Sequence, residues 1–301
     1  MFAGKTDISL EELAAAIYGR LKMKKCGLIL LALVLLVPVL FSVGCSSVAP
    51  VSNDDTAGSP TEVGTLVFTA NGEEFIREGF LTKDGWELTF DQAYVTMGSI
   101  TAYQTDPPYD TDQGWDIDYQ VKVELDGIHS ANLADPASDP AELEELAEVP
   151  AGHFNALSWT MVRAVEGPSA GYSLFLTGQA EKNGRVIDFT LGIEQEVAYL
   201  GGDYIGDERK GIVATGEIAE LEMTYHFDHL FGDGEEDLDD PLNEEALGFE
   251  PLAALAVDGV LEADLASLEG ALSSADFELL LSILTHFGHV GEGHCLAQFI
   301  D

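Results

Sequence analysis

The feature that most constrains the fold is an alternation of apolar and polar residues that recurs between residues 64 and 232. In 84-DGWELTFD-91, Trp86, Leu88 and Phe90 fall on one face of an extended chain, and the residues between them fall on the other. A period of two is typical of a strand with one buried face, and turn residues separate each run from the next. The pattern predicts a mainly β fold, an antiparallel β-sandwich.

Two further segments support the same fold class. The runs 172-YSLFLTGQAEK-182 and 185-RVIDFTLGI-193 flank Asn183 and Gly184, a pair that favours a tight hairpin turn because both residues tolerate positive φ. The segment 217-EIAELEMTYHFD-228 predicts a strand. Its inward residues are Leu221, Met223, Tyr225 and Phe227.

The character of the chain changes after residue 232. The acidic stretch 233-DGEEDLDDP-241 is interpreted as a connector, and leucines and alanines then recur at intervals of three and four across 250–259 and 260–272. Ser273 is placed to cap a helix over 274–287 that Gly288 ends. We therefore expect a sandwich domain over 64–232, and over 233–301 a connector and a short helical tail packed on it.

The N-terminal region reads as an export signal. Residues 23–44 hold a short basic start and an unbroken apolar run, and 41-FSVGC-45 resembles a bacterial lipobox. The alternative, a transmembrane anchor, suits the run less well because a span prefers about 20 apolar residues. Residues 1–22 carry acidic groups ahead of the signal, so we interpret them as an extension from a miscalled start.

Cleavage before Cys45 would leave that cysteine as the site of lipid attachment. Residues 45–63 are small and polar, as expected of a lipidated tether. The lipid on Cys45 would make a membrane the partner of the protein, because two or three acyl chains are enough for stable anchoring. The expected location is extracytoplasmic, on a bacterial membrane that faces the periplasm or the cell surface. Cys295 would then be the one thiol left, so no intramolecular disulfide is expected.

The charge is extreme. Residues 1–44 hold five basic and three acidic groups, so the remaining chain has 8 basic against 51 acidic residues and a formal charge of −43. Such a surface repels phosphate backbones, which excludes nucleic acid as a partner. The acidity fits a saline habitat, where salt screens the repulsion, or a surface that collects cations.

Five of the seven histidines lie in two short segments, 224-TYHFDHLFGDGEE-236 and 282-SILTHFGHVGEGHC-295, and each segment contains the spelling HFxH. Imidazole and thiolate are the preferred ligands of zinc and copper. The candidate metal ligands are His226, His229, His286, His289, His294 and Cys295. Six exceed the four of a tetrahedral site, so some belong to an outer shell or there are two sites.

The strand pattern places His226 and Asp228 on the same polar face, and His229 joins His226 only if the strand bends or ends there. Mixed histidine and cysteine ligation makes zinc the first expectation and copper the second. The predicted role is metal capture or delivery.

Other interpretations stay open. The histidines can be structural or solvated in a surface interaction domain, or the protein can be a metal-dependent hydrolase, with Asp228 and Glu292 as candidate bases. No catalytic motif is found, so an enzyme is not the expectation. The five aspartates of loop 105–118 offer oxygen ligands to calcium, although their spacing is not that of an EF-hand. His129 and His153 stand alone and are interpreted as structural.

Three segments, 149-VPAGHFNALSWTM-161, 171-GYSLFLTGQAEKNG-184 and 220-ELEMTYHFDHLFGDG-234, together resemble the MbnP-like periplasmic proteins, a family of β-sandwich lipoproteins or secreted proteins associated with copper handling. The similarity covers about half of the chain after Cys45. It implies a sandwich and a periplasmic metal-binding role, and it assigns no ligand.

Overall fold

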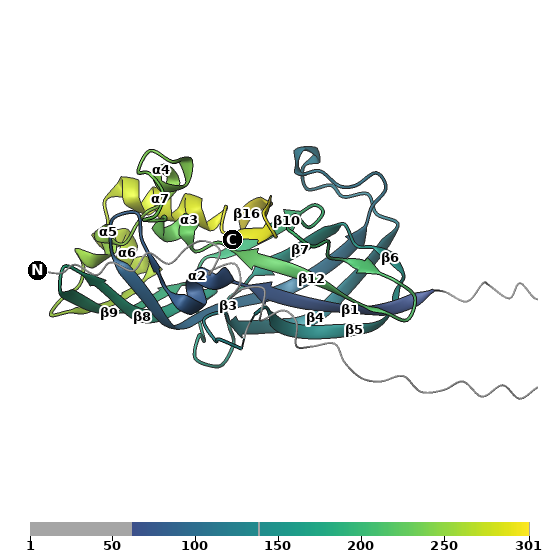
Figure 1. The fold of residues 1–301 in the computed structure, drawn as a ribbon, viewed down its shortest axis with the longest axis horizontal. Coiled ribbons are helices and arrows are strands. Elements are labelled where there is room, and N and C mark those ends of the chain that lie inside the picture. The colour runs from purple at the N-terminus through teal and green to yellow at the C-terminus, as the bar shows by residue number, and fades with distance from the viewer. Residues whose placement is uncertain (1–61, 138, 301) are drawn as a thin grey trace, which may run out of the picture. The chain divides into compact units, whose positions relative to one another are not determined.

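The computed structural model describes residues 62–137 and 139–300 (Figure 1). The predicted N-terminal extension 1–22, the signal 23–44 and the lipid-bearing Cys45 lie outside these residues, as does most of the tether. The described residues form a mainly β structure with a short helical tail, as the alternation predicts. Among them, no helix is long and apolar enough to span a membrane.

The larger sheet is built around the long strand β3. Its strand order is β13–β9–β8–β3–β7–β10–β16, and β2 and β4 also pair with β3. The bounds are β2 (Phe80–Leu81), β3 (Glu87–Gln104), β4 (Val121–Asn132), β7 (Ala156–Met161), β8 (Leu174–Lys182), β9 (Arg185–Ile193), β10 (Glu196–Gly201), β13 (Val260–Asp264) and β16 (Leu296–Ile300).

The smaller sheet has the strand order β15–β14–β12–β1–β5. The bounds are β1 (Val63–Asn71), β5 (Ala141–Pro150), β12 (Ile218–Tyr225), β14 (Gly288–Val290) and β15 (Gly293–His294). A separate pair joins β6 (Gly152–His153) to β11 (Ile212–Val213). The pairings are antiparallel except for β1 with β12 and β9 with β13, which are parallel.

The predicted hairpin is confirmed. Strands β8 and β9 pair from Leu174↔Ile193 to Lys182↔Arg185. The two residues between them have positive φ, 53° at Asn183 and 77° at Gly184. The turn chemistry at this point therefore sets the register of the two strands.

Strand β12 is covered on both faces. Its predicted inward residues, from Leu221 to Phe227, are buried in the main hydrophobic core, which β1, β3 and β8 also line. The alternate residues Glu222, Thr224 and His226 are buried as well. On this second side the chain after β10 supplies Lys210, whose Nζ bonds to Glu222 at 2.6 Å and lies 5.1 Å from the centre of the Tyr204 ring. Polar side chains on β12 are thus enclosed by protein.

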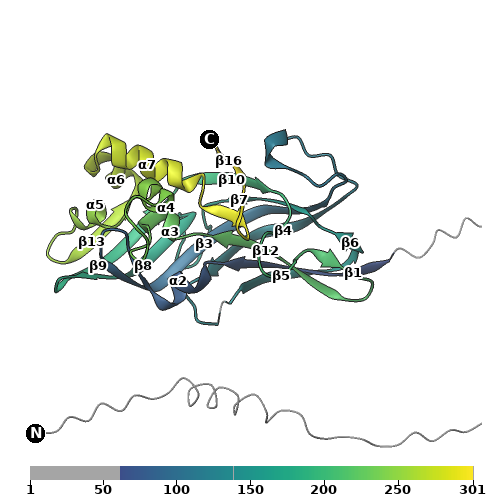
Figure 2. The same cartoon turned by 45° about the horizontal axis from the view of Figure 1, so that its top comes forward.

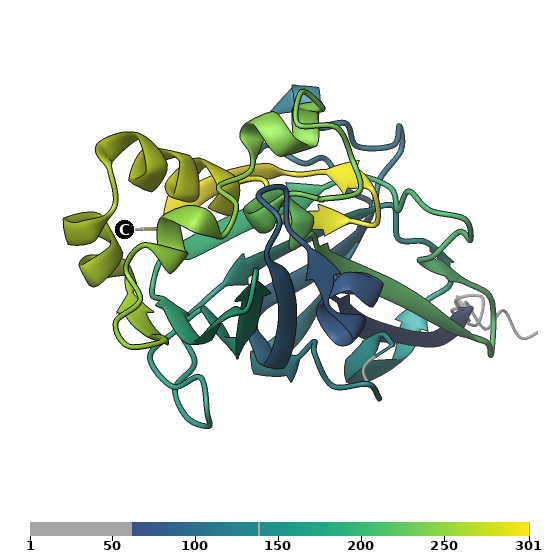
Figure 3. The same ribbon diagram turned by 60° about the vertical axis from the view of Figure 1, so that its left-hand side comes forward.

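Most of the helices lie in the C-terminal part of the chain. Figures 1 and 2 show α4 to α7 together over one end of the larger sheet, and Figure 3 brings them toward the viewer. The bounds are α2 (Glu73–Glu78), the 3-10 turn η1 (Thr111–Gln113), α3 (Asp228–Phe231), α4 (Pro241–Glu245), α5 (Glu250–Ala253), α6 (Leu265–Ala271) and α7 (Ser274–Leu284). Ser273 caps α7 as predicted, with its Oγ accepting from the Asp276 N–H at 3.1 Å.

The tail contains more strand than its leucine spacing predicts. Residues 260–264 form β13, in which Leu261 is buried between the exposed Val260 and Glu262, so a period of two wins locally over the helical one. Asp264 then caps α6 through a capping box with Ser267. Farther on, β14 and β15 form a hairpin, and β16 pairs with β10. The tail therefore completes both sheets.

Candidate metal centre

The two HFxH segments meet through their phenylalanines. Phe227 and Phe287 are both buried, and their rings pack edge to face with centroids 5.0 Å apart. Strand β14 pairs with the end of β12, with Thr224 opposite His289 and Tyr225 opposite Gly288. This pairing sets the His226 and His289 rings 4.4 Å apart. The shared HFxH motif thus places a buried phenylalanine, which anchors the segment in the core, between the histidines of each pair.

His229 joins the cluster because β12 ends at Tyr225 and the chain turns into α3. In a continuing strand the His229 side chain would point away from His226. From the sequence, the two are expected to meet only if the strand bends or ends here, and the strand does end. The His229 ring stacks on His226 at 5.3 Å and lies 5.1 Å from His289. Three imidazoles from two distant segments therefore share one site.

A single backbone carbonyl orients two of these rings. The His286 carbonyl oxygen accepts from His229 Nδ1 at 2.8 Å and from His289 Nε2 at 2.9 Å. A carbonyl only accepts, so both nitrogens carry the proton, which leaves lone pairs on His229 Nε2 and His289 Nδ1. Among the described residues, His289 Nδ1 is a buried atom with no hydrogen-bond partner. Fixing one imidazole nitrogen so that the other is free is the usual outer-shell arrangement of a metal-binding histidine.

The third ring, His226, lies between two acceptors. Its Nε2 donates to the Gly291 carbonyl at 3.2 Å, and its Nδ1 lies 3.2 Å from a Glu73 carboxylate oxygen. Burial lowers the pKa of His226, but the bond and charge of Glu73, the Gly291 carbonyl and Asp228 outweigh burial and raise this pKa to about 9. Without a metal, His226 is therefore an imidazolium at neutral pH, paired with Glu73.

The other two rings are neutral. Burial, followed by the charges of His226, His229 and His294, lowers the pKa of His289 to about 3. Burial is also the main cause that lowers the pKa of His229. Both residues therefore offer lone pairs at neutral pH, which is the form that binds metal.

Among the described residues, two overlapping donor groups contain carboxylates, and neither includes His289. One is formed by His226, Asp228 and His229, and the other by Glu73, His226 and Glu292, and in each the candidate ligand atoms lie within 4.8 Å of one another. Burial, the largest cause, raises the pKa of Asp228 against the opposing charges of His229 and His226. Sequence reasoning missed Glu73, because nothing in 73-EEFIRE-78 distinguishes it from the many other acidic residues.

The remaining candidate ligands lie elsewhere. The His286 side chain is exposed and turns back on the preceding helix α7, with Nδ1 bonded to the Ser282 carbonyl at 3.0 Å, so this residue serves the cluster through its backbone. His294 is exposed at the edge, with its ring 4.8 Å from His289. The structure therefore brings together three of the six predicted ligands, with His294 beside them.

Cys295 faces away from the cluster. Its sulfur lies against Val290 and Gly201, on the side of the aromatic core that β10 covers. Burial raises the pKa of this thiol well above its usual range. In this position the thiol acts as a small apolar side chain, and the donor set near the histidines contains nitrogen and oxygen.

An open pocket of about 520 Å³ adjoins the cluster between α4 and α7. It is lined by three histidines and mostly apolar residues: His229, Pro241, Leu242, Glu245, Leu279, Ser282, Ile283, His286 and His294. An ion or a small molecule can therefore approach His229 from this side.

The aspartates of loop 105–118 do not gather into a group of three among the described residues. Asp110 instead accepts from the Asp112 N–H at 2.9 Å, a local turn contact. His129 Nε2 bonds to the Asp126 carbonyl at 3.0 Å, and His153 Nε2 lies 2.9 Å from Asp203. These two histidines stand apart from the cluster.

Comparison of the chain with protein-family models, with curated proteins and with solved structures gives no match. The resemblance to MbnP-like proteins therefore stays a prediction, and the functional argument depends on the site itself.

Proposed function

We propose that this protein is a membrane-anchored extracytoplasmic lipoprotein that binds a transition metal at the histidine cluster, for metal capture or delivery. The observation that carries the proposal is the pair of bonds from His229 and His289 to the His286 carbonyl. The two bonds fix both tautomers and leave two lone pairs beside His226. A purely structural pair of histidines has no need of a buried nitrogen without a partner.

Zinc is the first candidate metal and copper the second. Zinc binds imidazole together with carboxylate, which is the donor set of His226, Asp228 and His229. Cuprous copper prefers sulfur, and the Cys295 thiol lies on the other side of β14, against Gly201. Copper binding at this cluster would accordingly be to the cupric ion.

The test is metal stoichiometry. The full chain, purified without a histidine tag, is expected to retain or take up about one zinc per molecule by elemental analysis. The His226→Ala/His289→Ala variant should lose that zinc. His286→Ala is the matched control, because it removes an imidazole from the same segment and keeps the carbonyl. A wild-type protein that takes up neither zinc nor copper would rule the proposal out.

The anchoring part has its own test. Metabolic labelling with palmitate is expected to mark the protein and to place it in the membrane fraction, and Cys45→Ser should abolish both results. Peptides from residues 6–20 in the native protein would contradict a start at Met23.

A second candidate is a structural role in a surface interaction domain. It is favoured by the bonds that join the tail to β12 and α3, from His226 to Gly291 and from His229 to His286, because an ion bound here would hold the same segments together. Under this alternative, zinc would protect the amides of residues 240–300 from hydrogen exchange and chelation would expose them. Reversible loading without such a change favours capture.

A further inference from the structure

Glu73 has a backbone conformation that a glutamate rarely adopts. Strand β1 ends at Asn71, and after Gly72 the chain enters α2 at Glu73 with φ of 61°. This left-handed region costs free energy for a residue with a Cβ, and it persists only where the surroundings impose it. The strained residue is the one whose carboxylate reaches His226 Nδ1.

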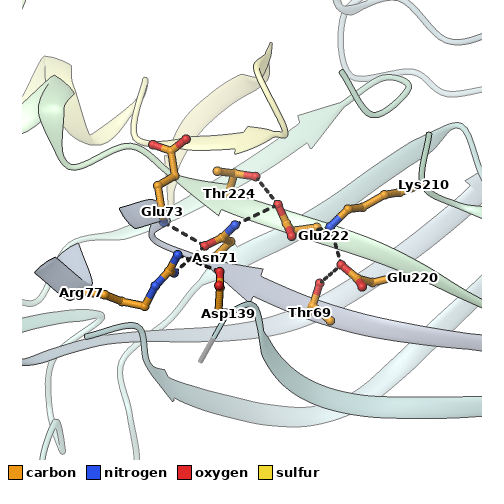
Figure 4. A network of polar contacts seen from close by, with 9 residues as sticks. All are labelled: Thr69, Asn71, Glu73, Arg77, Asp139, Lys210, Glu220, Glu222 and Thr224. Atoms are coloured by element: carbon orange, nitrogen blue, oxygen red, sulfur yellow. Dashed lines mark hydrogen bonds and ion pairs between the residues drawn. The ribbon is translucent and has the colours of Figure 1, made fainter. Parts of the chain in front are cut away.

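Asn71 imposes this conformation. Its Oδ1 accepts from the Glu73 backbone N–H at 2.9 Å and from the Arg77 guanidinium at 3.1 Å. Its Nδ2 donates to Glu222 at 3.4 Å. Figure 4 shows the amide between these groups, with the Glu73 carboxylate pointing away from Asn71 toward the C-terminal segment. Asn71 is thus held on both sides of its amide.

The far end of this chain of contacts is a buried ion pair. Glu222 is 2% exposed, and its carboxylate accepts from Lys210 Nζ at 2.6 Å and from the Thr224 hydroxyl at 3.1 Å. The parallel register of β1 and β12 sets Asn71 opposite Thr224, which brings the amide within reach of Glu222. A buried carboxylate with these partners is a fixed point, because removing any partner leaves it short of a bond.

We propose that Glu73 is a carboxylate ligand of the metal site and that Asn71, fixed by Glu222 and Lys210, is the residue that positions it. The inference rests on the proposed function. Glu73, His226 and Glu292 already hold their ligand atoms within 4.8 Å of one another. A carboxylate ligand neutralises part of the charge of a buried divalent cation, and a ligand held in place before binding loses little entropy on binding.

A merely structural role predicts something different. If Asn71 only caps the start of α2, its loss weakens the fold, and metal affinity falls equally whether or not Glu73 has a carboxylate. If Asn71 acts through Glu73, its effect on metal affinity disappears once that carboxylate is gone. A double-mutant cycle separates the two.

The experiment measures zinc affinity by competition with a chromogenic chelator, using the full chain and the variants Asn71→Ala, Glu73→Gln and the double variant. Each single variant is expected to weaken zinc binding by about 10- to 100-fold, and the double variant no more than Glu73→Gln alone. Thr69→Val is the matched control: its hydroxyl donates to Glu220 in the same network at 3.1 Å, away from Glu73, and zinc affinity should stay unchanged.

Equal weakening by Asn71→Ala in both backgrounds would overturn the inference. If Asn71→Ala does not fold, Asn71→Ser, which also cannot bridge Glu222 and Glu73, takes its place in the cycle. A wild-type chain that binds no metal would sink the proposed function and the ligand role with it. The positioning role is then decided by a crystal structure of the metal-free variant: Glu73 should leave positive φ and its carboxylate should leave His226, and an unchanged Glu73 refutes it.

Discussion

The two HFxH segments share a sequence motif but contribute different atoms to the cluster. In 226-HFDH-229, which follows β12 and runs into α3, both imidazoles enter the cluster. In 286-HFGH-289, which follows α7 and runs into β14, the His289 imidazole enters the cluster and His286 contributes its carbonyl. The phenylalanines have equivalent places, and the backbone around them does not. The direction of the backbone on either side of the phenylalanine therefore decides which histidine atoms of the motif face the cluster.

The anchor itself gives the largest expected effect. Phe287→Ala should lower the free energy of unfolding by about 3–5 kcal/mol, because it removes a fully buried ring that packs on Phe227 and Tyr225. Urea denaturation checks this value. Phe227→Ala should cost a similar amount, and a clear inequality between the two would show that the anchors are not equivalent.

The segments should also differ in their response to pH. In the metal-free protein, the pKa of His226 is raised from 6.5 to about 9, so its contribution to stability is complete below pH 6.5 and is lost as pH rises through 9. The loss is on the order of 3 kcal/mol. Denaturant titrations of the wild type and of Glu73→Gln between pH 6 and 10 measure it.

The second segment shows the opposite shift. The pKa of His289 is lowered to about 3. The free energy of unfolding should therefore fall on acidification below pH 6.5, because the unfolded chain takes up a proton at this residue and the folded chain does not. His289→Gln should flatten the curve between pH 6.5 and 5. An unchanged curve would contradict a buried neutral imidazole at this position.

The third position of the motif gives a smaller effect. A Cβ on Gly288 would lie 3.0 Å from the rings of Trp159 and Tyr199, so Gly288→Ala should destabilise the fold by about 1–3 kcal/mol. Thermal unfolding is the measurement. The first segment carries Asp228 at this position, where α3 has room for a side chain. A neutral Gly288→Ala would show that β14 can shift away from the core.

The smallest effect is expected at Cys295. Its thiol is packed against Val290 and Gly201, so Cys295→Ala should leave zinc affinity unchanged. The comparison with His289→Gln, measured by the same competition titration, isolates imidazole from thiolate. A large loss of affinity in Cys295→Ala would restore the thiol to the donor set.

Local patterns predicted the parts of the structure that are locally determined. Alternation identified the sandwich, Asn183 and Gly184 fixed a hairpin, and Ser273 marked the start of α7. The strand β13 was expected to be helical because its leucine and alanine spacing continues into α6, and only pairing with β9 distinguishes the two. Tertiary pairing of this kind is invisible in a single segment.

The residues of the candidate site also fall into those that local sequence predicts and those that only tertiary pairing reveals. Histidine scarcity elsewhere in the chain pointed to His226, His229 and His289. A sequence does not show which atom of a residue faces a site, so it gives no ground for separating these three from His286, whose carbonyl serves the cluster, or from Cys295, whose thiol faces Gly201. Glu73 lies on an element with no motif, and its relation to His226 arises from the parallel pairing of β1 with β12. Composition cannot single out one carboxylate among 54 acidic residues.

The parallel pairing of β1 and β12 also bears on timing. Glu73 follows the first described strand, whereas His289 belongs to the hairpin near the last one, and β12 lies between them in the sheet. No fragment that lacks either end holds both Glu73 and His289. Contacts this distant along the chain form late, after the entropy of closing long loops has been overcome. Zinc occupancy would therefore report that folding is complete, and a nascent or clipped chain would leave the ion in solution.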